Sequence, residues 1–178
     1  REPYLTGQGV LIAVIDSGID YESPEFRDAQ GNTRIQFLWD QTLNAGQVNE
    51  LLPQEAAEFA EKAAPPDGFG IGVEFSKYRI DAALKSRFPK QIVPSVDTSG
   101  HGTAVAAIAA AGGRLLEGQY QGVAPESELL IVKMGTPMPN SFPKTTELMR
   151  AMTYVIKKAV EMGKPLAINL SFGNTYGS

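Results

Sequence analysis

The strongest constraint on the fold is an unbroken apolar run, Val10 to Ile15, that ends abruptly at Asp16-Ser17-Gly18. A continuous run rich in β-branched residues is typical of a strand that is buried on both faces of a parallel sheet. Similar runs occur at Leu129 to Lys133 and at Leu166 to Leu170. We therefore predict an α/β fold with a mainly parallel sheet, whose ligands bind at the carboxyl ends of the strands.

The segments between these runs have helical patterns. Thr146 to Met162 has apolar residues at helical spacing, whereas Thr103 to Ala111 is apolar on every side, which predicts a helix buried all round. The remaining expected elements are a strand at Arg34 to Trp39 and helices at Pro53 to Ala64 and Ile80 to Arg87.

Composition excludes several classes of function. There are 16 Lys and Arg residues against 20 Asp and Glu residues, and the basic residues are scattered, so nucleic acid is not expected as a partner. The longest apolar run, Ala104 to Ala111, is far shorter than the ~18 residues of a membrane span. Without cysteine and with one histidine, thiolate sites and zinc sites with two imidazoles are excluded.

Asp16 and His101 are the candidate catalytic residues. Each lies beside glycines at the end of an expected element, where backbone without Cβ allows a close approach. A carboxylate next to an imidazole fixes the tautomer of the ring and stabilises the imidazolium that forms when the ring takes up a proton. The structural alternatives are a capping aspartate in a turn and a satisfied histidine at a helix start.

Four motifs, in order along the chain, resemble those of the subtilisin-like serine proteases. Val14 to Ile19 resembles the segment around the catalytic aspartate of that family, and His101-Gly102-Thr103 resembles its histidine segment. The connection that follows the histidine helix in that family is similar to Gly122 to Pro125. The strand whose end forms one wall of the family's pocket for a substrate side chain is similar to Ile168 to Gly173. The long segment 44–94 is more similar to the clostridial spore-germination branch than to secreted subtilisins.

The resemblance implies a three-layer subtilisin-like fold, a peptide or protein substrate, and a role for several residues. Asp16 and His101 would be catalytic, and Ser17 would support the aspartate carboxylate. Gly100 and the segment Ser171-Phe172-Gly173 would line the substrate cleft. No cofactor is required; calcium often accompanies the family, but no Asp-rich ligand loop is visible here, so a metal site stays open. A secreted or a spore or cell-envelope location is expected.

The family's nucleophile segment, Gly-Thr-Ser-x-Ala, and its oxyanion-hole Asn have no counterpart in this sequence. Ser99 and Ser171 are interpreted as structural or substrate-lining residues. We therefore expect residues 1–178 to be the amino-terminal half of one catalytic domain, inactive alone. Its expected partner is the remaining half, or a second copy that associates through the sheet edge exposed at Leu166 to Leu170.

Two alternatives stay open from the sequence. The first is a non-catalytic pseudoprotease or peptide-binding module. The second is an aspartic protease that uses Asp16-Ser17-Gly18 from two copies. Aspartic proteases have a nearly all-β fold, and the strong helical patterns argue against it. This alternative would also leave His101 unexplained.

Overall fold

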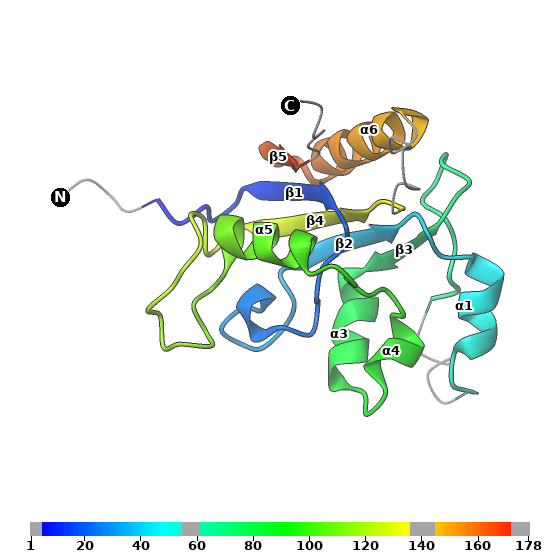
Figure 1. The fold of residues 1–178 in the computed structure, drawn as a ribbon, viewed down its shortest axis with the longest axis horizontal. Coiled ribbons are helices and arrows are strands. Elements are labelled where there is room, and N and C mark those ends of the chain that lie inside the picture. Colours follow the sequence, from blue (N-terminus) through cyan, green and yellow to red (C-terminus); the bar gives the residue numbers. More distant parts are fainter. Residues whose placement is uncertain (1–4, 55–60, 136–144, 172–178) are drawn as a thin grey trace, which may run out of the picture.

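The computed structural model describes residues 5–54, 61–135 and 145–171 (Figure 1). The strands are β1 (Leu11–Asp16), β2 (Ile35–Asp40), β3 (Val73–Ser76), β4 (Glu128–Lys133) and β5 (Leu166–Leu170). The helices are α1 (Ala45–Leu51), α3 (Lys77–Lys85), α4 (Pro89–Ile92), α5 (His101–Ala110), α6 (Thr145–Met162) and the 3-10 helix η1 (Pro24–Phe26).

The five described strands form one sheet in the order β3-β2-β4-β1-β5. β1 pairs in parallel with both β4 and β5, and β2 pairs in parallel with β4. Only β3 runs the other way, against β2. The prediction of an α/β fold with a mainly parallel sheet is confirmed.

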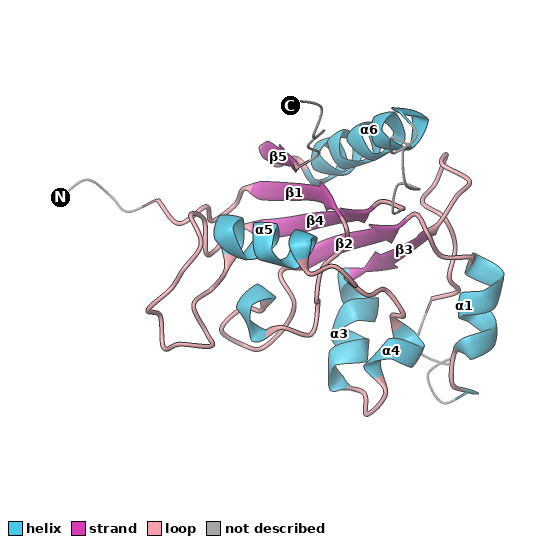
Figure 2. Ribbon diagram, in the orientation of Figure 1, coloured by secondary structure: helices cyan, strands magenta, loops and turns pink. Residues whose placement is uncertain are grey.

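Helices cover both faces of this sheet, so the described chain has three layers (Figure 2). Side chains alternate along a strand, and neighbouring residues therefore enter different cores. Val14 and Ile131 pack with Ala106 of α5. Their neighbours Ile15 and Val132 lie in the second core, on the side of α6. Leu11 and residues 13–15 of β1, and residues 129–132 of β4, are fully buried, as their apolar runs predict.

An aromatic cluster attaches α6 to the sheet. The ring of Trp39 in β2 lies 5.0 Å from the ring of Phe69 and 4.9 Å from that of Tyr154 in α6, measured between centroids. The indole Nε1 donates to the carbonyl of Ile71 at 3.0 Å, and the Tyr154 hydroxyl bonds to Glu74 at 2.6 Å. Both polar groups are thereby satisfied inside the core, as buried Trp and Tyr require.

The structure corrects the prediction that the helix after Gly100 is buried all round. α5 begins at His101, and only its sheet-facing side, with Ala106 and Ala110, is buried. Ile108 on the outer side is 73% exposed. The apolar composition predicts burial on every side, but in the described chain α5 contacts the sheet on one side only.

Four described elements, η1, α1, β3 and α4, were not expected from the sequence. The helix predicted at Pro53 to Ala64 is wrong at its end, because residues 61–64 are not helical, and residues 55–60 lie outside the described part. Among the described helices, none combines the length and the apolar content of a membrane span.

Two isoleucines of the chain test this burial pattern. Ile131→Ala removes a side chain that is fully buried in β4, and we expect it to lower the free energy of unfolding by about 2–5 kcal/mol. The matched change Ile108→Ala, on the exposed side of α5, is expected to stay within about 0.5 kcal/mol. Urea unfolding followed by circular dichroism measures both. Equal losses would contradict the one-sided burial of α5.

Candidate active site

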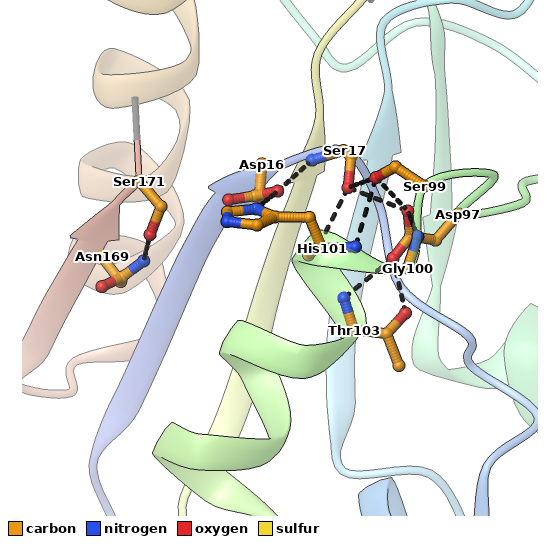
Figure 3. A network of polar contacts seen from close by, with 10 residues as sticks. Asp16, Ser17, Asp97, Ser99, Gly100, His101, Thr103, Asn169 and Ser171 are labelled. Atoms are coloured by element: carbon orange, nitrogen blue, oxygen red, sulfur yellow. Dashed lines mark hydrogen bonds and ion pairs between the residues drawn. The ribbon is translucent and has the colours of Figure 1, made fainter. Parts of the chain in front are cut away.

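The candidate residues gather at the carboxyl end of the parallel strands. Asp16 is the last residue of β1, and His101 is the first residue of α5 (Figure 3). Ser171 directly follows β5, whose residue Leu170 is in register with Ile15 of β1, the neighbour of Asp16. Ligands of parallel sheets bind at this edge, so the position agrees with the expected site.

Asp16 and His101 are in direct contact. The Nδ1 atom of His101 lies 2.8 Å from Oδ1 of Asp16, which also accepts the backbone N–H of Ser17 at 2.7 Å. The aspartate side chain is 5% exposed and the imidazole is 58% exposed. Oδ2 of Asp16 is buried without a hydrogen-bond partner among the described residues.

This geometry determines the proton chemistry of the ring. The hydrogen bond from Nδ1 to Asp16, and next the negative charge of that carboxylate, raise the pKa of His101 above its usual 6.5. Because a carboxylate only accepts, neutral His101 must carry its proton on Nδ1, which leaves the lone pair of Nε2 available. The arrangement can therefore take a proton from a hydroxyl or thiol presented to Nε2.

The two residues meet only because position 102 has no side chain. A Cβ atom at Gly102 would lie 2.2 Å from the backbone oxygen of Gly18 and 3.2 Å from Cβ of Asp16. Gly18 itself has a φ of 120°, in the region that favours glycine. The first turn of α5 thus contacts the turn after β1 directly, as the glycines beside both candidate residues predict.

Side chains satisfy the first three backbone N–H groups of α5. His101 N donates to Ser99 Oγ at 3.2 Å, Gly102 N to Ser17 Oγ at 2.9 Å, and Thr103 N to Asp97 Oδ2 at 2.8 Å. These groups have no partner inside the helix, and the helix cap itself, Gly100, has no side chain to offer.

Asp97 is a residue of this site that none of the sequence motifs includes. It lies before the N-cap position, which is Gly100, so the usual capping pattern does not point to it. The hydroxyl of Ser17 is bonded to Asp97 and to the backbone of α5 rather than to the side chain of Asp16. Of the residues expected to support Asp16, Ser17 contributes its backbone N–H to that carboxylate.

The other expected site residues are only partly visible. Gly100 caps α5 with a φ of 74°, and its N–H donates to Asp97. Ser171 accepts a bond from Asn169 at 2.7 Å. Ser99 bonds to Ser17 and to the backbone of His101, not to the imidazole. Phe172 and Gly173 lie outside the described residues.

A metal site is not visible in the part of the chain that the structure describes, where no three His, Asp or Glu side chains group closely enough to hold an ion.

The aspartic-protease alternative is not supported, because the sheet is mainly parallel and the partner of Asp16 is an imidazole. A carboxylate–imidazole pair at the carboxyl edge of a three-layer α/β sheet is instead the arrangement that nucleophilic hydrolases use to activate a hydroxyl. The chain belongs to the subtilase family, whose sequence model matches residues 7–178.

A solved structure agrees with this family. The structure of the Clostridium perfringens CspB protease is 37% identical, with a TM-score of 0.73, over 98% of this chain and 31% of that chain. The present chain therefore spans about a third of the length of that protease. A comparison with curated proteins gives no match. The predicted resemblance to subtilisin-like proteases, including a clostridial one, is confirmed.

Titration of the lone histidine tests the Asp16–His101 contact. Because His101 is the only histidine, its ring signals in an NMR spectrum need no further assignment. We expect its pKa to lie above 6.5, and Asp16→Asn to lower it, since the negative charge is lost and the remaining amide oxygen is a weaker acceptor. An unchanged titration in Asp16→Asn would show that the two side chains are apart.

Gly102→Ala tests the close approach of α5 to β1. In an ordinary helix interior this change stabilises by about 1 kcal/mol. Here we expect a loss of about 1–3 kcal/mol, because the new Cβ overlaps the backbone of Gly18. The pKa of His101 should also fall towards its ordinary value as the ring moves from Asp16. A stabilised variant with an unchanged titration would contradict this.

Proposed function

We propose that this chain supplies the aspartate and histidine of a subtilisin-like serine endopeptidase, Asp16 and His101. The observation that carries the proposal is the 2.8 Å contact between His101 Nδ1 and Asp16 Oδ1. Membership of the subtilase family and the similarity to a clostridial protease support it. The serine of the triad would come from residues that this sequence does not contain.

In the proposed mechanism, His101 is the general base and then the general acid. Nε2 takes the proton from the serine hydroxyl as its oxygen attacks the carbonyl carbon of the peptide bond. The imidazolium formed gives the same proton to the leaving amine when the C–N bond breaks, which leaves the acyl group bonded to the serine oxygen. A water molecule then attacks this acyl group and gives a proton to Nε2, and the ring passes that proton to the serine oxygen as the acid is released. Asp16 holds the ring in place and stabilises its charged form.

The proposed substrate is a peptide or protein that binds in extended form beside the site. Gly100, which is exposed and has no side chain, and the segment Ser171-Phe172-Gly173 would line the cleft. The backbone of the substrate would then form hydrogen bonds with the backbone of an exposed segment of this chain, as in β-strand addition. The proposed mechanism requires no cofactor.

The proposed partner is the remaining half of the catalytic domain, or a second copy of this chain. β5 pairs only with β1 among the described strands and so forms a sheet edge. Apolar side chains lie exposed around it and on the helices, including Leu170 at 41%, Val160 at 76% and Ile108 at 73%. Exposed apolar surface next to an unpaired edge favours association.

His101→Ala in the complete enzyme tests the function. Loss of the imidazole in related triads reduces turnover on the order of a million-fold, and we expect a comparable loss in peptide hydrolysis here. Retention of a tenth of the activity by a folded variant would overturn the assignment. Circular dichroism of the same variant checks its fold.

The identity of the missing nucleophile separates the two classes of function. The 178-residue chain alone should not react with a fluorophosphonate probe, because neither Ser99 nor Ser171 is bonded to the imidazole. A serine at the Gly-Thr-Ser-x-Ala position of the complete protein would support the peptidase. Another residue at that position would support the non-catalytic peptide-binding alternative.

A further inference from the structure

We propose that Asp97 is a positioning residue that fixes the first turn of α5, and with it the ring of His101, against Asp16. The inference rests on the proposed function, since it concerns the same base. It starts from the bonds to the Asp97 carboxylate, which join three separate pieces of chain: the turn after β1, the loop 97–100 and helix α5 (Figure 3).

Both oxygens of Asp97 accept short hydrogen bonds. Oδ1 accepts from Ser17 Oγ at 2.8 Å and from Gly100 N at 3.0 Å. Oδ2 accepts from Thr103 N at 2.8 Å and from Thr103 Oγ1 at 2.6 Å. Only an ionised carboxylate can accept at all of these positions.

Because the Asp97 carboxylate only accepts, it fixes which group donates in each hydrogen bond around it. Because Ser17 gives its only proton to Asp97, its oxygen is left to accept from Gly102 N and from Ser99 Oγ. Thr103 likewise gives its hydroxyl proton to Asp97 and accepts from Asp20 N at 2.9 Å. The carboxylate thus orients the hydroxyls that hold the turn after β1 on α5.

An asparagine cannot replace this aspartate in either orientation of its amide. The backbone N–H of Gly100 points at one oxygen and that of Thr103 at the other, so the NH₂ group always faces a donor. One backbone N–H of the helix start is then left unpaired.

The network stays intact over the range in which His101 titrates. Partial burial acts to raise the pKa of Asp97, but the hydrogen bonds from Thr103, Ser17 and Gly100 together outweigh it and leave the pKa below its ordinary value. The charged groups around the imidazole are Asp16 at the end of β1 and Asp97 before α5, with Asp20 and Lys133 close to the same turn.

The deciding test uses a substitution that changes no charge. Thr103→Val removes the hydroxyl bonds to Asp97 Oδ2 and to the backbone N–H of Asp20, but it keeps the backbone N–H bond to Oδ2 and the shape of the side chain. We expect it to lower the pKa of His101 in the 178-residue chain and to speed hydrogen exchange at the first amides of α5 on the order of tenfold. Thr103→Ser keeps the hydroxyl and should titrate like the parent.

Asp97→Asn should lower the pKa of His101 further, because it removes the negative charge and one of the two acceptor oxygens. Glu25→Gln is the matched control. That carboxylate also accepts backbone N–H groups, from Gly113 and Leu115, but at the loop beyond the other end of α5. It should cost stability without changing the titration of His101.

The outcomes separate this proposal from the function. A lowered pKa in Thr103→Val, rescued by Thr103→Ser, supports positioning. An unchanged pKa in Thr103→Val beside a lowered one in Asp97→Asn overturns it, because Asp97 then acts by charge alone. A titration that is unaffected by Asp16→Asn overturns the proposed function itself. If Asp97→Asn does not fold, Thr103→Val still decides.

Discussion

The parallel pairing of β1 with β4 determines where everything else lies. The two strands are in register from Leu11 with Glu128 to Asp16 with Lys133, and helices cover both of their faces. A shift of one residue would exchange the side chains that face the two cores, so that Ile15 and Val132 would face α5 in place of Val14 and Ile131, and the observed register avoids this. That register places Asp16 at the sheet edge, where α5 brings the imidazole to it.

At this edge, stability and chemistry depend on the same atoms. The N–H groups that open α5 are donors that must be satisfied somewhere, and here Ser99, Ser17 and Asp97 satisfy them. Two of these side chains also connect the helix to the turn after β1. The position of the imidazole thus follows from helix capping, an interaction that is common in proteins and carries no catalytic meaning by itself.

The sequence predicts the long elements and the contact between Asp16 and His101, and misses what is short or non-local. β1, β4 and β5 are mainly apolar, and α6 has a clear helical period, so their patterns are visible without a structure. β3 has four residues and α1 has seven, too few for a period; the capping residue Asn44 was the one available signal for α1. Asp97 was missed because its partner Ser17 is 80 residues away.

Burial of Trp39 gives the molecule a built-in optical probe. It is the only tryptophan of the chain, and it lies under α6, whereas the only histidine lies at the start of α5 on the opposite face. A shift of indole fluorescence to longer wavelength therefore reports exposure of the core under α6 to water. The imidazole resonances report unfolding of the α5 layer. Comparison of the two signals across one denaturant series reveals, without any added label, whether both layers melt in a single cooperative step.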